Sequence, residues 1–235
     1  MTEKKEERIP TYIKNFDKLI QGGFKPQSIN LVVGGAGTGK TIFAIQFLIE
    51  GIINKGETGI YITFEEKKEK LYSDMLTFGW DLKKLEKQGK FIFLQYNPEQ
   101  VKKVLIEGGG TIESIITKNK ARRLVIDSIT SFSLLYKDEL TRKEAALSLF
   151  ELINNWGCTA VLTAQQTTRG EEIFSNTLEF EVDSLIRMYN IKKKGVRKRA
   201  FEIVKMRGTN HSPKTMKMEI GKKGMEFDPS KVVEY

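Results

Sequence analysis

A glycine-rich stretch early in the chain could bind phosphate. Residues 34–41 read GGAGTGKT and fit the pattern G-x-x-x-x-G-K-[ST]. In this pattern the glycines let backbone N–H groups turn toward the phosphates, and the lysine brings a positive charge to the β- and γ-phosphates. An apolar run at 29–33 precedes the stretch, and an apolar helical run follows it, as the motif requires. We therefore predict a nucleotide site formed by Gly35, Ala36, Gly37, Thr38, Gly39, Lys40, Thr41 and Ile42.

Acidic residues follow two other apolar runs. Asp127 ends LVID, and we expect it to hold Mg²⁺ together with the Thr41 hydroxyl, since α/β folds place ligand contacts at the carboxyl ends of strands. Glu65 and Glu66 follow GIYITF, where one of them could orient the water that attacks a nucleotide. Alternatively, both acids simply begin the next helix, where negative charge is favourable. The sequence does not decide between these two interpretations.

An amide and a basic segment occur later in the chain. Gln165 ends the run CTAVLTAQ, where it could sense the γ-phosphate or satisfy backbone groups of the following loop. In VKMRGTNH, residues 204–211, Lys205 and Arg207 continue the alternation of Phe201 and Ile203. One face of a strand is thus predicted to change from apolar to cationic, so its charges should meet an anion beyond the core. A solvated strand edge is the alternative.

The positive charge of the chain is concentrated at its C-terminal part. The net charge is +9, and residues 187–235 hold 14 Lys or Arg against 5 Asp or Glu. Such an excess can attract nucleic acid or acidic protein surfaces, or it can be a set of solvated strand edges. Nucleic acid is a possible partner, but no aromatic side chain for base stacking interleaves the basic cluster. That cluster, expected at a hairpin tip, contains Lys192, Lys193, Lys194, Arg197, Lys198 and Arg199.

The apolar patterns predict an α/β fold with a mostly parallel central sheet flanked by helices and a C-terminal β-meander, in one domain over residues 1–235. Strands are expected at 29–33, 59–64, 90–96, 122–128 and 158–166, then at 179–191, 198–206 and 215–227. Helices are expected at 40–54, 65–80, 111–120 and 142–157, with Thr111 as the cap of the third.

The remaining composition indicates the class of protein. Cys158 lies in an apolar run, and we expect a buried structural thiol. The N-terminus is charged, and no apolar run approaches the roughly 20 residues that span a bilayer. We expect a cytoplasmic protein without membrane insertion.

Several segments together resemble the KaiC-like branch of the RecA-superfamily P-loop ATPases. They occur in the same order as in that branch and read RIPTYIKNFDKLIQGGF, TGKTIFAIQFLIEG, YITFEE, FGWDL, VIDS and KMRGTNH. The resemblance implies a RecA-like fold, binding of ATP and Mg²⁺, paired acids at Glu65 and Glu66, and a nucleotide-proximal Thr77. It also implies a ring of identical subunits, usually a hexamer, in which the following residues reach the ATP of the neighbouring subunit: Lys205, Met206, Arg207, Thr209 and His211.

Three functions agree with these features. The first is an oligomeric ATPase that hydrolyses ATP slowly and acts as a regulatory or signalling switch on a protein partner. The second is a recombinase-related ATPase that binds single-stranded DNA. The third is an ATP-binding scaffold that does not hydrolyse ATP, in which Glu65 and Glu66 are structural. The clock protein that names the branch has two such domains in tandem, whereas this chain has one, and no counterpart of its phosphorylation segment is found here.

Overall fold

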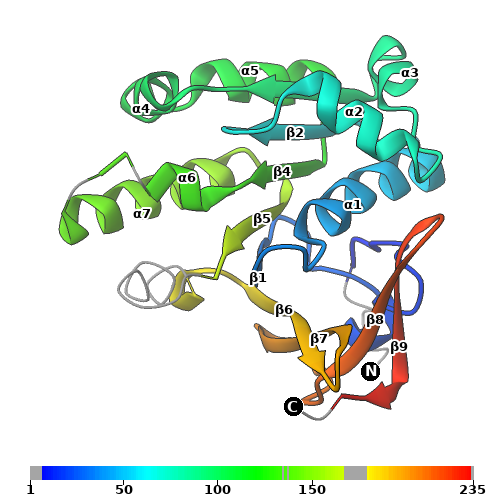
Figure 1. Cartoon of the computed structure of the whole chain (residues 1–235). Coiled ribbons are helices and arrows are strands. Elements are labelled where there is room, and N and C mark those ends of the chain that lie inside the picture. The colour runs from blue at the N-terminus through cyan, green and yellow to red at the C-terminus, as the bar shows by residue number, and fades with distance from the viewer. Residues whose placement is uncertain (1–6, 134, 137, 167–178, 234–235) are drawn as a thin grey trace, which may run out of the picture.

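The computed structural model describes residues 7–133, 135–136, 138–166 and 179–233. Within these ranges, nine strands form one sheet in the order β3-β2-β4-β5-β1-β6-β7-β8-β9 (Figure 1). Neighbouring strands are parallel from β3 to β6 and antiparallel from β6 to β9. The predicted mostly parallel sheet with a C-terminal β-meander is therefore confirmed. The strands are β1 (Ile29–Gly34), β2 (Gly59–Thr63), β3 (Phe91–Gln95), β4 (Arg123–Asp127), β5 (Thr159–Gln165), β6 (Ser184–Lys193), β7 (Val196–Met206), β8 (Met216–Gly221) and β9 (Gly224–Val232).

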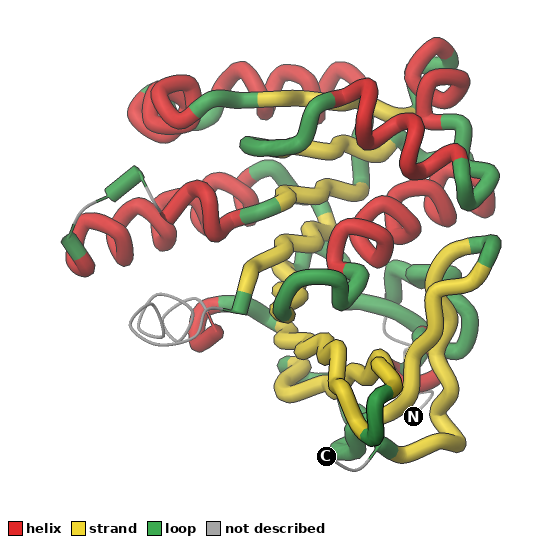
Figure 2. The backbone as a smooth tube through the Cα atoms, viewed as in Figure 1, coloured by secondary structure: helices red, strands yellow, loops and turns green. Residues whose placement is uncertain are grey.

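Helices cover both faces of the parallel strands (Figure 2). They are α1 (Lys40–Lys55), α2 (Lys68–Leu76), α3 (Leu82–Lys87), α4 (Pro98–Ile106), α5 (Gly110–Asn119), α6 (Ile129–Ser133), α7 (Glu139–Asn155) and the 3-10 helix η1 (Asp17–Ile20). Alternate residues of β1 belong to two separate cores. Val32 packs in the core that holds α1, α2 and α3, and Leu31 and Val33 pack in the core that holds α5 and α7. The strand that leads into the glycine-rich loop is thus fixed from both sides.

The helix that follows this loop is also tied to the C-terminal hairpin. α1 is buried over most of its length, as its nearly continuous apolar sequence predicts. Its one buried amide, Gln46, donates to the Met225 carbonyl at 3.2 Å and accepts from the Met225 N–H at 2.7 Å. A Cβ on Gly224 would lie 2.6 Å from Gln46 Oε1, so the hairpin backbone lies directly against the helix. The β8–β9 hairpin therefore packs beside the start of α1 (Figure 1).

Some predicted boundaries are wrong. The helix expected at 65–80 is limited to α2, because the chain turns after Leu76 and Gly79 is left-handed. Thr111 does not cap α5, which begins at Gly110 after a left-handed Gly109 with no side-chain cap. The strand expected from residue 179 begins at Ser184, and residues 179–181 form a helical turn. The short helices α3, α4 and α6 were not predicted.

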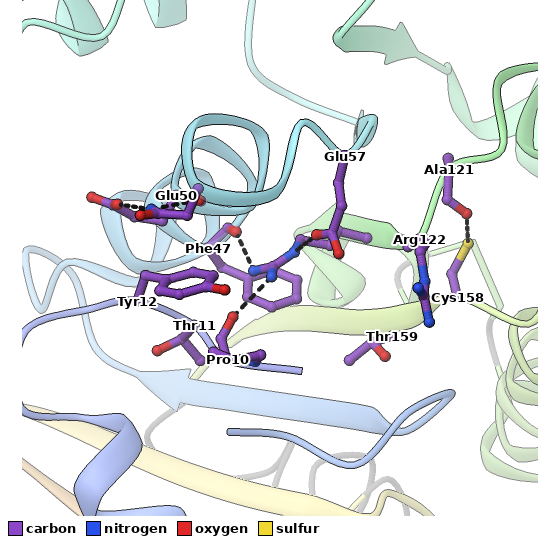
Figure 3. Close-up of polar contacts among 12 residues, drawn as sticks. Pro10, Thr11, Tyr12, Phe47, Glu50, Glu57, Ala121, Arg122, Cys158 and Thr159 are labelled. Carbon is purple, nitrogen blue, oxygen red and sulfur yellow. Dashed lines mark hydrogen bonds and ion pairs between the residues drawn. The ribbon is translucent and has the colours of Figure 1, made fainter. Parts of the chain in front are cut away.

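A fully buried arginine ties the N-terminal segment to the sheet. The Arg123 guanidinium donates to the Phe47 carbonyl at 2.9 Å and the Pro10 carbonyl at 2.8 Å, and it pairs with Glu57. It also lies 4.6 Å from the centroid of the Phe47 ring. Figure 3 shows Pro10, Phe47 and Glu57 converging from three different parts of the chain. This cluster fixes the middle and the end of α1 relative to the strands, and each nitrogen of the buried guanidinium has a hydrogen-bond partner.

Replacing Arg123 by leucine is expected to lower the free energy of unfolding by about 3–5 kcal/mol, because the Glu57 carboxylate, only 13% exposed, and two carbonyls lose their donor. Arg122 provides a matched control, since its side chain is 58% exposed and its ion pair with the exposed Glu7 is 3.5 Å long. Arg122→Leu should change the same quantity by less than about 0.5 kcal/mol. Urea unfolding followed by circular dichroism measures both, and equal losses would contradict a structural role for Arg123.

Two further expectations concern the class of protein. Cys158 is buried and its thiol donates to the Ala121 carbonyl at 3.3 Å (Figure 3). Burial raises the pKa of this thiol to about 11, so the predicted structural role is confirmed over a nucleophilic one. Across the described part of the chain, no helix combines the length and the apolar character that crossing a bilayer requires.

Candidate active site

The glycine-rich loop has the backbone that its sequence predicts. Gly37 and Gly39 lie in the left-handed region, with φ of 73° and 100°. A Cβ on Gly34 would lie 2.5 Å from the Met188 carbonyl oxygen, so no larger residue fits there. The Thr38 hydroxyl donates to the Gly35 carbonyl at 2.9 Å and closes the turn. The loop is thereby held between the end of β1 and the start of α1, where helix N–H groups can face an anion.

The Lys40 ammonium lies beside the glycine-rich loop, where it could contact a bound anion. Its ammonium donates to the carbonyls of Gly34 at 2.7 Å and Gly35 at 3.0 Å, so the side chain folds back under the loop. Burial lowers the pKa of Lys40, and the nearby Asp127 carboxylate opposes that shift. A phosphate group at the loop would compensate the positive charge that burial disfavours. The residues present therefore fit a bound nucleoside triphosphate.

Asp127 is held at the end of β4 by two hydroxyl groups. Tyr61 donates to its carboxylate at 2.9 Å, and Thr163 donates to the other oxygen. Burial, followed by the negative charge of Asp127, raises the pKa of Tyr61 well above its usual value, so the phenol stays protonated and keeps donating. Within the described residues, no three carboxylate, imidazole or thiol groups gather into a metal site. Mg²⁺ needs only one or two protein ligands beside phosphates and water, so Thr41 and Asp127 fit that ion.

A pocket of about 380 Å³ opens beside the loop, and four of the predicted residues line it. These are Thr41, Ile42, Glu66 and Thr77. The remaining wall comes from α2 and the turn after it, through Leu71, Asp74, Met75 and Phe78. The Thr77 hydroxyl donates to the Asp74 carbonyl at 2.6 Å, which orients it at the pocket. Residues from β2–α2 and from the glycine-rich loop thus meet in one cavity.

The two adjacent glutamates have different surroundings. The backbone N–H groups of Glu65 and Glu66 both donate to the Thr63 hydroxyl, at 3.3 Å and 3.1 Å. The Glu65 carboxylate accepts from Ser131 in α6, whereas Glu66 lines the pocket and lies 3.8 Å from Lys70. Of the two glutamates, Glu66 alone lines the pocket that also contains Thr41. Which of the two acts as a base remains a prediction.

Gln165 lies next to the loop at the end of β5. It pairs with Gly34 in the sheet, and its backbone N–H donates to the Thr130 hydroxyl at 2.8 Å. Its side chain is exposed. The Thr130 hydroxyl thus satisfies the backbone N–H of Gln165 itself, and the exposed amide side chain remains available to a ligand.

Arg199 was missed as a residue of this site. It was assigned to the basic hairpin tip, but its Nε donates to the Gly37 carbonyl at 3.0 Å. Arg199 alternates with Phe201 and Ile203, which are both buried, so it points to the core side of β7. That alternation could have revealed its direction from the sequence. Its partner, 162 residues away, could not be found that way.

The alternation predicted for the basic segment at the end of β7 is wrong. β7 carries a β-bulge, since Ile203 pairs with Ile186 and Lys205 pairs with Leu185, which leaves Val204 as the extra residue. Met206 is therefore the buried residue after Ile203, and Lys205 and Arg207 face away from that core. Lys205 donates to the Glu179 and Phe180 carbonyls at 2.9 and 3.0 Å, and Arg207 donates to the Phe180 carbonyl at 2.7 Å.

These cations lie at the far end of β1 from the glycine-rich loop. Ser184 pairs with both Asn30 and Met206, so the end of β7 is level with the start of β1. The loop begins four residues further on, at Gly34, which is about 13 Å along the strand. Arg207 therefore lies at the opposite end of β1 from the loop of its own chain. Thr209 is buried and accepts from Arg8 at 2.7 Å, and His211 is half-buried nearby.

Comparisons with known proteins agree with this architecture. A family model described as "ATPase: KaiC" matches residues 9–232. The chain is 33% identical to circadian clock protein KaiC3 of Synechocystis over 97% of its own length, and it spans 47% of that relative. It is also 33% identical to UPF0273 protein MJ1359 of Methanocaldococcus jannaschii, with 96% of this chain and 98% of the relative covered.

A solved structure shares the fold over nearly the whole of both chains. The crystal structure of the KaiC-like protein PH0186 from Pyrococcus horikoshii superposes with a TM-score of 0.83 at 36% identity. It covers 95% of this chain and 99% of that chain. The predicted RecA-like fold is thereby confirmed, and the chain belongs to the KaiC family of ATPases.

Proposed function

We propose that this chain is a Mg²⁺-dependent ATPase that hydrolyses ATP slowly at sites shared between neighbouring subunits of a ring. The observation that carries the proposal is the position of Lys205 and Arg207, about 13 Å along β1 from the loop of their own chain. Lys205 and Arg207 would reach a phosphate bound at a glycine-rich loop only when that loop belongs to another copy of the chain. We further propose one ATPase domain over residues 1–235, a hexameric ring in the cytoplasm, and a switching role toward a regulatory protein partner.

Each group has a defined task in this proposal. The loop N–H groups and Lys40 bind the β- and γ-phosphates, Gln165 senses the γ-phosphate, and Thr77 contacts the nucleotide at the pocket. When bound through Thr41 and Asp127, Mg²⁺ would neutralise charge on the phosphates. Glu66 or Glu65 orients the attacking water and accepts its proton. The shared side of the site is completed by the neighbour's Lys205, Met206, Arg207, Thr209 and His211.

The dependence of activity on protein concentration tests the shared site. ATP turnover per chain should fall on dilution, in step with the loss of oligomers measured by light scattering, because a lone chain lacks the cations. Constant turnover through the range in which the oligomer dissociates would overturn the proposal. Tight ATP binding without turnover in a fully assembled ring would instead support the non-hydrolysing scaffold.

Arg199 should act on ATP affinity from within the same chain. Arg199→Ala removes the donor to Gly37, so the free loop samples conformations that do not bind phosphate. We expect ATP affinity to fall about 5- to 10-fold, which corresponds to about 1–1.4 kcal/mol. Isothermal titration measures the affinity. Arg197→Ala, two residues earlier on the same strand and exposed, is the control and should leave it unchanged.

A further inference from the structure

Within residues 7–133, 135–136, 138–166 and 179–233, no helix covers the outer face of the β-meander. On β6 and β7, the pairs Met188–Phe201 and Ile186–Ile203 point into the core beneath α1. Strand alternation therefore places the pairs Ile191–Lys198 and Lys193–Val196 on the opposite face. Lys217 continues this outer face on β8, because it pairs with Ala200. The outer face thus alternates between aliphatic and lysine side chains.

A groove of about 770 Å³ lies on this outer face. We call it the lysine groove; it is lined by Ile191, Lys193, Lys194, Val196, Lys198, Lys217, Ser230, Lys231, Val232 and Val233. Two of its aliphatic side chains are exposed to solvent to an extent that is uncommon for valine, since Val196 is 59% exposed and Val232 is 52% exposed. Among the residues that the structure describes, five lysines and no acidic residue contribute to the lining.

The charges of the groove are only partly compensated. Lys217 pairs with Glu219, and Lys231 lies 3.1 Å from Asp228. Within the described residues, Lys194 and Lys198 take part in no ion pair, and both are exposed. The excess positive charge is therefore concentrated at the β6–β7 end of the groove. A ligand must bring negative charge to that end and apolar groups to the floor.

A protein segment fits this combination better than a nucleic acid does. Single-stranded nucleic acids bind through phosphate contacts together with aromatic stacking, and among the described residues no aromatic side chain lines the groove. Exposed valines and an isoleucine instead suit aliphatic side chains, and lysines around them suit carboxylates. Arg199, one of the two arginines near the hairpin tip, contacts the glycine-rich loop and does not line the groove.

We propose that the lysine groove is the docking site for a partner protein, which binds through a segment that combines aliphatic side chains with Asp or Glu. This proposal specifies the chemistry of the partner protein that the proposed function invokes. It rests on the proposed function only for the existence of such a partner. β6 pairs with β1 up to Gly34, where the loop begins, and β7 carries Arg199, which donates to Gly37. A ligand in the groove therefore contacts the same hairpin that holds the loop. Docking is therefore expected to affect ATP affinity.

The test uses the full chain and four fluorescent probes. These are a peptide of about ten residues alternating Glu and Val, its Gln and Val counterpart, a Glu and Ser counterpart, and an oligo-dT strand of similar length. The Glu–Val peptide should bind at least about tenfold more tightly than either counterpart, because it alone supplies both charge and aliphatic groups. Lys194→Glu, Lys198→Glu protein should lose about tenfold or more in affinity for that peptide.

Controls distinguish the groove from general basic charge. Lys83→Glu, Lys87→Glu in α3 makes the same charge change at the opposite end of the sheet and should leave peptide binding intact. Val196→Ser should weaken the Glu–Val peptide and leave the Glu–Ser peptide unchanged. Tighter binding of oligo-dT than of the Glu–Val peptide, or equal losses in the two lysine variants, would overturn the proposal. Binding is measured without ATP, so failure here is separate from failure of the shared ATPase site.

Discussion

Replacing Arg207 by alanine is expected to lower the rate of ATP hydrolysis in the proposed ring by about 10³-fold, while ATP affinity should change only a few-fold. A cation supplied across an interface stabilises the charge that develops during phosphoryl transfer, so its loss affects turnover more than binding. Steady-state ATPase assays and isothermal titration separate the two effects. Arg207→Lys should recover only part of the rate, because lysine cannot reproduce the planar fork of arginine.

Mixing two inactive proteins provides the control for this prediction. In rings that contain both Lys40→Ala and Arg207→Ala subunits, some interfaces join an intact loop to an intact Arg207, so activity should return. The contact of Arg207 with the Phe180 carbonyl raises the alternative that the variant is simply misfolded. A misfolded subunit would not restore activity to its neighbour. Recovery would therefore exclude misfolding, and mixtures no more active than the separate proteins would contradict the shared site if both variants show the circular dichroism and the assembly of the wild type.

Replacing Lys40 by methionine should abolish both hydrolysis and the stabilisation that ATP gives. At ATP concentrations about 100-fold above Kd, the wild-type protein gains about 2.7 kcal/mol of unfolding free energy, and the variant should gain none. The measurement is a thermal unfolding midpoint with and without ATP and Mg²⁺. Lys55→Met, at the exposed end of the same helix, is the control and should respond to ATP as the wild type does.

The same variant should be at least as stable as the wild type when no nucleotide is present. Burial lowers the pKa of Lys40 in the folded state below the 10.5 of an unfolded lysine, so folding at neutral pH disfavours its charged form. Methionine removes that cost. Its advantage should shrink as the pH rises from the lowered pKa toward 10.5, because the wild-type amine then becomes neutral. A nucleotide-free variant that unfolds much earlier at pH 7 would indicate that Lys40 is needed for folding itself.

The parts of the site that depend on local sequence could be predicted. The motif that ends at Lys40 and Thr41 fixes its own geometry, since glycine φ values and the following helix come from neighbouring residues. Asp127 could be placed because LVID reads as a buried strand that must end at the ligand edge of the sheet. The short helix α4 could also have been predicted, since Asn97 and Gln100 form a capping box at its start.

Features that depend on strand pairing could not be predicted. The bulge at Val204 exists only relative to β6, and the sequence of β7 alone indicates regular alternation. The hydrogen bond of Arg199 to Gly37 joins residues brought together by the sheet order. The anchoring of Lys205 and Arg207 on carbonyls of residues 179 and 180 likewise requires the turn before β6, which was predicted as strand.

The side-chain amide of Gln46 limits which segments can be exchanged between homologous chains of this fold. It presents a donor and an acceptor to a single backbone residue of β9, so glutamate would lose the donated hydrogen bond inside the core and methionine would lose both. Position 46 and the C-terminal hairpin consequently form one module despite being 179 residues apart. A chimaera that grafts this hairpin onto a homologous chain should carry the glutamine with it.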